Sequence, residues 1–488
     1  MSLLSVLSNA RSSLSVTSQQ TAVVSRNVAN AQDPSATRKY ANSIYTRPGA
    51  VEIRSISQSS DPALYRTLIN AQSSLGTNET IADALDRLRE VIGDVDSPTS
   101  PSSSLAALKD ALTDLAASPE SAQLQRAAVD KAKAMTASLN TASDAVQAMR
   151  KDADTELKQS ADAMRKLLSD LESVNNGVVV GTRSGNDVTD LVDRRDQIVA
   201  EISKYVGVSV RSRGDNDIIL TTDSGIVMFD KMPRSIEFSP TSSFDPSIRM
   251  DNATAARRPG AFKIDGVDIS ANGSMPVRSG SLQGLLQVRD EMGPEFQEKL
   301  DMMARGLVTQ FTESGGPGLF QSASGTDPIT ARSIMVAARV DYAVGGDAKL
   351  LRDGAVNAAS TSPNTAGDSG YSQWLNTLVG KVTSPLDLRP YDWSSATPGT
   401  FGTGQNSSLV DFSAASIAWL EGKRSDATEG SSYQKIMVAR AQETLSNSTG
   451  INLDEEMTRL LDLERSFQAS TKLIATVGEM LDQLINIA

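Results

Sequence analysis

The chain ends in LDEEMTRLLDLERSFQASTKLIATVGEMLDQLINIA, residues 453–488, where apolar residues recur in alternating steps of three and four. Nine of the eleven positions in this spacing are apolar, and only Glu456 and Ser470 interrupt the run. A stripe of this period is typical of a helix that packs along a partner helix. The sequence therefore predicts a terminal coiled-coil helix that begins just after Asn452.

The first 30 residues carry a second stripe with the same spacing, which ends at Asp33-Pro34. Six of its eight positions are apolar, so these residues are also expected to form an amphipathic helix. Two such helices at opposite ends of the chain can pair, parallel or antiparallel, and bring the termini together. The positions of this stripe are Leu3, Leu7, Ala10, Leu14, Thr17, Thr21, Val24 and Val28.

More apolar residues flank the two stripes than one helix pair can bury, namely Val6, Val16, Val23, Met457, Leu461, Leu473, Met480, Ile485 and Ile487. Each fully buried Leu, Ile or Val contributes about 1.5–3 kcal/mol, so leaving them in water favours association with neighbouring copies. We therefore predict an assembly interface, within and between subunits, made by Leu3, Leu7, Leu14, Val24, Val28, Leu460, Leu463, Phe467, Ile474, Val477, Leu481 and Leu484.

Composition and charge narrow the function of the 488-residue chain. Aromatic residues make up 4%, which suits long helices better than an aromatic-rich sandwich, and the formal net charge is −12. An acidic chain without a basic block is a poor partner for nucleic acid or an anionic membrane. The sequence has no run of 18 apolar residues and no cleavable signal pattern, so we expect no membrane insertion.

The absence of both Cys and His excludes whole classes of site. Disulfides, thiolate zinc sites, Ser-His-Asp triads and histidine general bases all require one of these residues. A Ser432–Lys435 match to SxxK lacks its partner motif, and Asp215 with Asp217 lacks the rest of a calcium loop. The acids that follow Asn452 fit the start of a helix, where they complement its dipole. We expect no enzyme, catalytic residue, cofactor or metal.

The region after the first helix is predicted to be mostly helical, and one of its helices is very long. About 57 residues without Pro or Gly separate Ser118-Pro119, a helix start, from the next break at 175–177, which predicts a helix of roughly 85 Å. Residues 78–92 carry one apolar face, and residues 40–60 read as extended or a short hairpin. A further helix is expected near 431–446.

Short β-rich runs separated by turn signals follow between 177 and 270, and residues 282–311 return to helix. Residues 312–410 read as loop-rich with one strand at 333–338. The expected fold is α+β, with long terminal coiled-coil helices, a helical rod domain and an inserted, mostly β outer domain. The predicted division is 1–60 with 445–488, 61–180 with 411–444, and 181–410.

Four segments resemble the axial proteins of the bacterial flagellum, and within them the hook-associated members. Residues 21–31 (TAVVSRNVANA) are similar to the N-terminal signature of rod, hook and hook-associated proteins. Residues 452–457 (NLDEEM), with FQAS at 467–470 and MLD at 480–482, resemble the hook-associated C-terminus. Residues 190–196 (DLVDRRD), and 280–286 (GSLQGLL) with Arg289-Asp290, agree with the same members. The segment DPSAT at 33–37 departs from the family pattern.

The resemblance implies a structural subunit that joins the hook to the filament and polymerises through its terminal helices. It further implies export through a type III apparatus without a cleaved signal peptide, to an extracellular position in the flagellum. The implied partners are copies of itself, the hook protein, the next hook-associated protein on the filament side, and an export chaperone at the C-terminal helix. Two alternatives stay open: another axial component, such as a hook or distal rod protein, or a surface adhesin or enzyme carried on residues 181–410.

Overall fold

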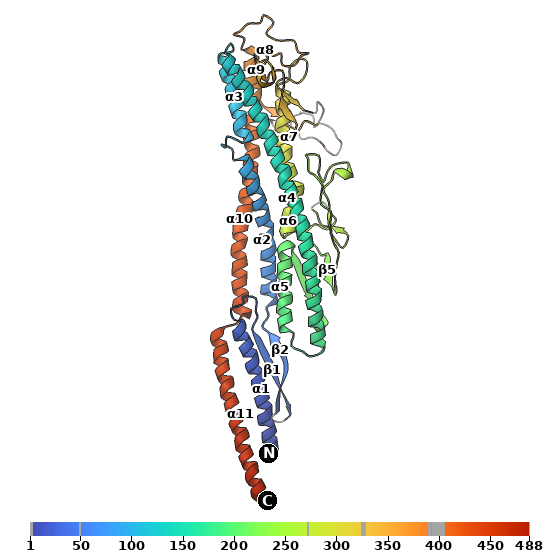
Figure 1. Ribbon diagram of the computed structural model, residues 1–488, viewed down its shortest axis with the longest axis vertical. Helices are drawn as coiled ribbons and strands as arrows, with labels where there is room; N and C mark the ends of the chain where they lie inside the picture. Colours follow the sequence, from blue (N-terminus) through green and yellow to red (C-terminus); the bar gives the residue numbers. More distant parts are fainter. Residues whose placement is uncertain are drawn as a thin grey trace.

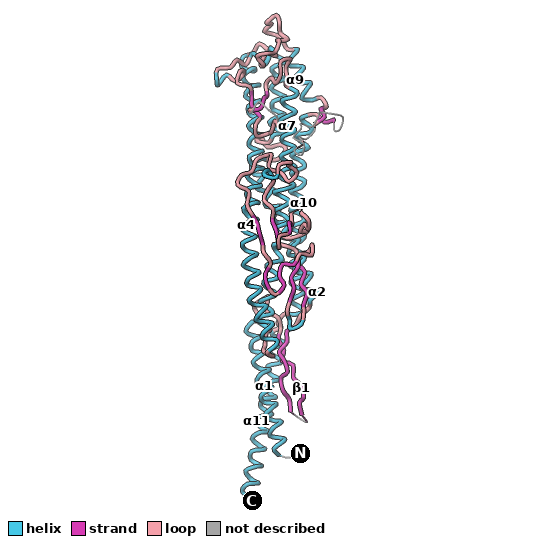
Figure 2. The backbone as a smooth tube through the Cα atoms, turned by 90° about the vertical axis from the view of Figure 1, so that its right-hand side faces the viewer, coloured by secondary structure: helices cyan, strands magenta, loops and turns pink. Residues whose placement is uncertain are grey.

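The computed structural model describes residues 3–487 except 48–49, 271–272, 324–327, 389–391 and 393–405. The molecule is a long rod of helices with small antiparallel sheets along it (Figure 1). Both ends of the chain lie together at one end of the rod, as a pairing of the terminal stripes requires (Figure 2). The expected α+β class is confirmed.

Four elements form what we call the terminal unit: α1 (Leu3–Asn30), β1 (Lys39–Arg47), β2 (Ala50–Gln58) and α11 (Leu453–Ile487). The strands pair as an antiparallel hairpin, with Ala41 opposite Ile56, which resolves the open expectation for residues 40–60. The hairpin packs along α1 on the other side from α11 (Figure 1). The N-terminal helix therefore lies between two partners, whereas α11 lies on the outside.

Five more helices run along the rod: α2 (Pro62–Ile92), α3 (Pro101–Ala117), α4 (Ala122–Arg183), α5 (Thr189–Tyr205) and α10 (Leu409–Thr449). The longest, α4, has 62 residues and spans about 93 Å at 1.5 Å per residue. The helices α2 and α10 pack antiparallel along much of their length (Figure 1). These helices form the backbone on which the other elements are arranged.

Both expected bounds of the long helix are wrong. Ser118 ends α3 instead of starting α4, and the oxygen of Ser121 caps α4 by accepting from the backbone amide of Leu124 (3.4 Å). Pro119 lies in the turn between them, where its carbonyl accepts from Gln125 (2.7 Å). Two Ser residues three positions apart offer equivalent caps to a sequence pattern, and tertiary packing decides between them.

The Asn-Asn-Gly at 175–177 does not end α4, which continues to Arg183. Asn175 is buried and donates to Asp217 (2.8 Å), which directly precedes the strand Ile218–Thr222. A residue that favours helix ends in isolation is held in the helix here, because it gains a partner from far along the chain.

The helix α10 begins at Leu409, well before the expected start near 431. Ser408 caps it by accepting from the backbone amide of Asp411 (3.1 Å). The early part of α10 buries Leu409, Ile417 and Leu420 in the main core. Burial of these side chains outweighs the weak helix propensity of a Ser- and Gly-containing segment.

Two small antiparallel sheets lie beside α4 (Figure 1). One has the order β3 (Val208–Ser212), β4 (Ile218–Thr222), β5 (Val227–Asp230) and β6 (Met232–Pro233). The other has β7 (Ile236–Phe238), β8 (Phe262–Ile264) and β9 (Val267–Asp268). These strands fall on the β-rich runs predicted between 177 and 270.

Residues 281–310 form one continuous helix in three parts: α6 (Ser281–Gln287), a π-helical turn η3 (Val288–Met292) and α7 (Gly293–Gln310). The region 312–410 holds more regular structure than the one strand expected, including α8 (Lys349–Asp353) and α9 (Gln373–Thr383), which buries Leu375, Leu378 and Val382. Its strands are β10 (Phe320–Ser322), β11 (Ile334–Val336), β12 (Leu386–Asp387) and β13 (Asn406–Ser407).

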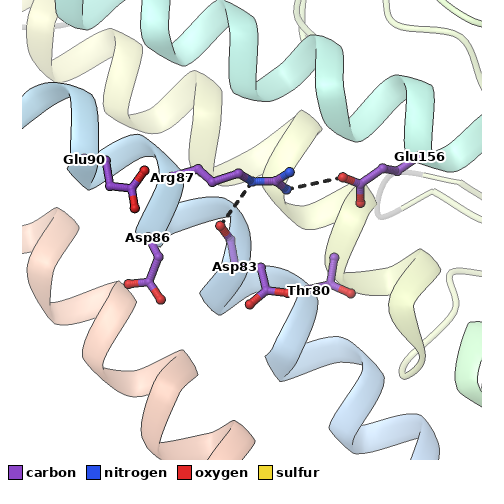
Figure 3. Close-up of a pocket in the computed structure, with 6 residues that line it drawn as sticks. All are labelled: Thr80, Asp83, Asp86, Arg87, Glu90 and Glu156. Atoms are coloured by element: carbon purple, nitrogen blue, oxygen red, sulfur yellow. Dashed lines mark hydrogen bonds and ion pairs between the residues drawn. The ribbon is translucent and has the colours of Figure 1, made fainter.

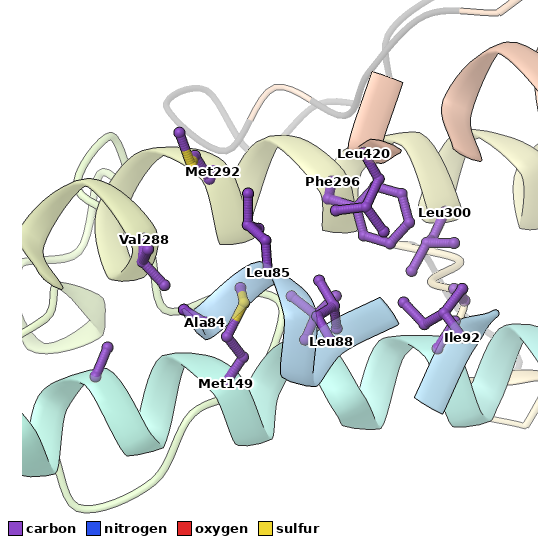
Figure 4. Close-up of a cluster of buried hydrophobic side chains, with 14 of the residues drawn as sticks. Ala84, Leu85, Leu88, Ile92, Met149, Val288, Met292, Phe296, Leu300 and Leu420 are labelled. Atoms are coloured by element: carbon purple, nitrogen blue, oxygen red, sulfur yellow. The ribbon is translucent and has the colours of Figure 1, made fainter. Parts of the chain in front are cut away.

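One hydrophobic core runs through these helices and sheets. Where α2, α4, α7 and α10 meet, it contains Leu85, Leu88, Met149, Phe296 and Leu420 (Figure 4). Among the described residues of α1, β1, β2 and α11, none belongs to this core. The terminal unit is thus attached to the rest of the molecule by other means.

Candidate assembly interface at the chain ends

The helices α1 and α11 lie side by side and antiparallel (Figure 1). Of the predicted interface residues, Val24 and Val477 are buried, and Phe467 is 43% exposed. Leu484 lies in α11, but its side chain is outside the described residues. The others are half-buried: Leu3, Leu7, Leu14, Val28, Leu460, Leu463, Ile474 and Leu481. The structure therefore brings the two predicted stripes together without covering them completely.

The residues that flank the stripes behave differently on the two helices. On α1, Val16 and Val23 are buried, because the hairpin packs along this helix. The expectation that these two residues need a neighbouring subunit is wrong for that reason. On α11 five large apolar side chains are about half exposed: Leu453, which belongs to the stripe, and Met457, Leu461, Leu473 and Met480, which flank it on its two sides. We call these five residues the apolar row of α11.

The two polar residues that interrupt the α11 stripe are both buried. Glu456 is 1% exposed, and its carboxylate accepts from Asn27 (3.0 Å) and from the Arg38 guanidinium (2.7 Å). Ser470 lies 3.3 Å from the hydroxyl of Ser13. Glu456 lies in the first turn of α11, as expected, and its carboxylate also bonds Asn27 of the opposite helix, which the sequence did not indicate.

The helix α11 begins directly after Asn452, as expected, and Asn452 caps it. The Asn452 side chain accepts from the backbone amides of Asp454 (3.0 Å) and Glu455 (3.4 Å). The carboxylate of Glu455 turns away to pair with Arg38 (2.5 Å). Arg38 therefore binds two consecutive acids of α11, and sequence analysis missed it because its partners lie more than 400 residues away.

Charged groups also join the terminal unit to α5. Arg26 pairs with Asp187 (2.8 Å) and Asp190 (3.3 Å). The buried amine of Lys39 contacts Asp190 and lies 3.4 Å from Asp193. Burial raises the pKa of Asp187, but hydrogen bonds from Thr189 and Arg26 hold that pKa below its ordinary value. We call this set of contacts the polar joint.

The polar joint explains two of the segments that carry the family resemblance. Arg26 and Asn27 belong to the N-terminal signature, and Asp190 and Asp193 belong to the DLVDRRD segment. Asn27 donates to the backbone carbonyl of Lys39 (2.8 Å) and accepts from its amide (3.1 Å). These motif residues hold α1, the hairpin and α5 in place around one point.

The glycines of the GSLQGLL segment permit close backbone contacts. Gly280 has a φ of +99°, and a Cβ there would lie 2.3 Å from the Tyr205 carbonyl oxygen. A Cβ at Gly284 would lie 2.7 Å from the Thr77 carbonyl oxygen. This segment therefore packs α6 directly against α2 and the end of α5, which any larger residue would prevent.

Arg289 and Asp290, which follow that segment, lie in the π-helical turn. Arg289 is fully buried and pairs with Asp154 (2.7 Å) and Asp290 (2.8 Å). Arg150 donates to the Arg289 carbonyl (2.9 Å), and burial lowers the pKa of Arg150 to about 10. Buried charges of this kind are tolerated because every one of them has a partner.

A polar hollow of about 400 Å³ lies between α2 and α4 (Figure 3). Arg87 reaches across the hollow and pairs with Glu156 (3.3 Å), and Asp86 pairs with Arg424 (3.1 Å). These are ordinary surface ion pairs without a nucleophile or a paired acid and base. The remaining lining residues are Thr80, Asp83 and Glu90.

The other candidate motifs also have structural roles. Lys435 of the SxxK match pairs with Glu79 (3.1 Å), Asp215 pairs with Arg183 (2.7 Å), and Asp217 pairs with Arg213 (2.8 Å). Within the described ranges, no three acidic side chains converge in a way that could hold a metal ion. No helix in the same part of the chain combines the length and apolar character that crossing a bilayer requires.

Comparison with known proteins agrees with this geometry. Residues 85–327 match a family model described as the flagellar hook-associated protein FlgK helical domain, and residues 441–487 match the flagellar basal body rod FlgEFG protein C-terminal model. The flagellar hook-associated protein 1 of Bacillus subtilis is 22% identical over 85% of this chain and 81% of its own length. That of Salmonella typhimurium is 21% identical over 99% of this chain and 100% of its own length.

The chain belongs to the flagellar hook-associated protein 1 family. The family consists of structural flagellar proteins and is not an enzyme family, so the chain has a structural role in the flagellar axis. A solved structure, the flagellar hook junction protein FlgK from Burkholderia pseudomallei, matches 78% of this chain and 99% of its own with 12% identity and a TM-score of 0.49.

Proposed function

We propose that this chain is the subunit that joins the flagellar hook to the filament, and that it polymerises through its terminal helices. The observation that carries the proposal is the uncovered apolar row on α11 beside a half-buried stripe. Burying an apolar side chain of this size contributes about 1.5–3 kcal/mol, so a neighbouring copy that covers the row gains substantially.

The proposed interface consists of the twelve residues predicted from the two stripes, together with the uncovered row. In this proposal α1 and α11 form an inner layer (1–60 with 445–488), the long helices form a rod layer (61–180 with 411–444), and residues 181–410 form an outer domain. The polar joint supports a boundary between the first two layers, because it stands where the hydrophobic core stops.

The proposed partners are further copies of the chain, the hook protein, and the next hook-associated protein on the filament side. Before assembly, an export chaperone would cover α11, whose apolar row is otherwise in water. We further propose type III export without a cleaved signal peptide, and an extracellular location at the end of the hook. The relatives named hook-associated protein 1 support this position.

A hook or distal rod protein is the nearest alternative, since the C-terminal match is to a model named for basal body rod proteins. The match over residues 85–327 to a hook-associated helical domain favours the junction. Labelling of the protein on detached hooks distinguishes the two. Label confined to the filament end of the hook supports the junction, and label along the hook or rod contradicts it.

The test of the polymerisation is Phe467→Asp in cells that lack the native chain. A charge in the middle of the stripe should abolish incorporation and motility, because a carboxylate is costly to bury without a partner. The half-exposed position predicts a normal fold for the rest of the chain, which circular dichroism of the purified variant checks.

Phe467→Leu is the matched control, since it keeps an apolar side chain and should retain most motility. Glu464→Asp, one helical turn away on α11, controls for disturbance of the helix itself. Normal incorporation and swimming of Phe467→Asp would overturn the proposal.

A further inference from the structure

Burial on α11 is opposite to what hydrophobicity alone would produce. Glu456 and Ser470 are buried, whereas Leu461 and Leu473 are more than half exposed. Leu461 and Leu473 flank the stripe on opposite sides, so a small turn of α11 that buried one would expose the other, and apolar burial alone does not select one rotation. The observed rotation and register must therefore be fixed by something other than apolar burial.

The polar contacts supply that constraint. Both oxygens of Glu456 accept hydrogen bonds, one from Arg38 and the other from Asn27. Asn27 is itself saturated, because its amide also bonds the backbone of Lys39 in both directions. Losing this arrangement would leave a carboxylate and an amide buried without partners, which is costly.

The two polar contacts share one register. Ser13 and Asn27 are fourteen residues apart on α1, and Ser470 and Glu456 are fourteen apart on α11, which is two heptads on each helix. A slip of one heptad moves the helices about 10 Å past each other. Ser470 would then face Val6 or Gln20, and Glu456 would lose both of its partners.

Arg38 also ties the contact to its own chain. Its backbone amide donates to the carbonyl of Thr449 (2.8 Å), at the end of α10 and just before α11 begins. The carboxylate of Glu456 is therefore bound by a residue that already lies at the entry to the same α11. An α11 from a neighbouring copy would have to displace this local contact.

We propose that the contacts of Asn27 and Arg38 with Glu456 are specificity determinants of the terminal helices, and that the Ser13–Ser470 contact marks the same register. They select the register of α1 on α11 and restrict α11 to the α1 of its own chain. The apolar row of α11 then stays available for neighbouring copies, so the inference rests on the proposed polymerisation. A single buried polar pair that fixes the register of a coiled coil is a known device.

The test uses cysteines, which the natural chain lacks. Ser13→Cys and Ser470→Cys are placed either on one full-length chain or on two chains of different tag length that are mixed before oxidation. With Asn27, Arg38 and Glu456 intact, the one-chain version should form an intramolecular disulfide, and the mixture should form little cross-linked heterodimer.

The apolar double variant Asn27→Leu/Glu456→Leu should raise the heterodimer about tenfold, as the population shifts toward exchanged pairing. The matched control Ser18→Leu/Glu464→Leu adds similar side chains at exposed positions of the same two helices and should leave the heterodimer unchanged. Heterodimer equal in the two double variants would overturn the inference.

Glu456→Gln is a milder variant, because it keeps the size and polarity of the side chain but removes the charge and one of the two accepting oxygens. It should give an intermediate yield of heterodimer, and a yield equal to that of the apolar variant would contradict the role of Arg38. Fluorescence of Trp374 and Trp419, which lie in α9 and α10, reports whether the rest of the chain is folded.

Failure of this inference can be distinguished from failure of the proposed function. If the apolar double variant keeps its pairing within one chain, the specificity determinants are wrong while the assembly proposal stands. If Phe467→Asp polymerises normally, the assembly proposal is wrong whatever the cross-links show.

Discussion

The helix α3 of the rod and the helix α11 of the terminal unit carry similar apolar stripes but bury them to very different degrees. The stripe of α3, which contains Leu105, Leu108, Leu112 and Leu115, is completely buried. On α11 the corresponding stripe is mostly half-buried and has an exposed apolar row beside it. The stripe of α3 is thus covered completely within one chain, whereas that of α11 has apolar surface left for another molecule.

The two regions also use charge differently. In the rod, Arg289 and Asp154 are fully buried and held by the surrounding core. At the polar joint, Asp190 is 60% exposed, and the contacts stand where the core has stopped. A connection made of ion pairs, some of them near solvent, can open with little exposure of apolar surface, so the terminal unit should move more readily than any helix of the rod.

The strongest test of this comparison is a matched pair of phenylalanines. Phe296 is 1% exposed and stacks on Trp419 with ring centroids 6.2 Å apart, so Phe296→Ala should lower the free energy of unfolding by about 3–5 kcal/mol. Phe467→Ala in the isolated chain should cost under about 1 kcal/mol, because that side chain is already half in water. Urea unfolding followed by far-ultraviolet circular dichroism, which reports the helices of both regions, measures both.

Equal costs for the two substitutions would break the comparison. A large cost at Phe467 would mean that the lone chain already buries its terminal stripe, and that a neighbouring copy is not needed to complete it.

The second test uses pH, and it concerns the rod alone. Burial raises the pKa of Asp301 to about 7, although hydrogen bonds from the Ala331 amide and the Gln297 side chain lower it. A carboxyl group with a raised pKa binds its proton more tightly in the folded state. Its contribution to stability is therefore fully present below about pH 4 and is lost as the pH rises to about 7.

In the Asp301→Asn variant this loss of stability with rising pH should disappear, because an amide of similar size does not titrate. The difference in unfolding free energy between the two proteins should change by about 1.4 kcal/mol per pH unit between pH 4 and 7. Urea unfolding at four pH values measures this slope. If the unfolding free energy depends on pH equally in both proteins, the raised pKa of Asp301 is contradicted. If the pH dependence affects only the terminal unit, the comparison between the rod and that unit is contradicted.

The parts of this molecule that could be predicted from the sequence are those with a regular local spacing of apolar residues or turn residues. The stripes of α1 and α11 are visible because each helix repeats its apolar residues every three or four positions, whatever it packs against. The strands between 208 and 264 are visible because β-rich runs alternate with turn residues. The family signature segments were also recognisable, although their physical roles were not.

The parts that sequence missed depend on partners far along the chain. Nothing near Glu456 indicates Asn27 or Arg38, and nothing near Asn175 indicates Asp217. The hairpin that covers Val16 and Val23 could not be placed on α1 from its own sequence. Each of these misses is a case in which a tertiary contact overrides a local preference.

The third test concerns Lys39, whose removal probes the polar joint directly. The buried Lys39 amine lies against the carboxylates of Asp190 and Asp193, so Lys39→Met removes the cation that both acids face. Asp190 is largely exposed, and the buried Asp193 keeps its hydrogen bonds from Thr37, so the loss should be only about 1–2 kcal/mol. Hydrogen exchange should accelerate about five- to thirtyfold in residues 21–30, while α4 stays protected.

Lys435→Met, which removes a surface ion pair with Glu79, is the control and should leave exchange in both regions unchanged. If Lys39→Met also reduced the protection of α4, the polar joint would belong to the rod.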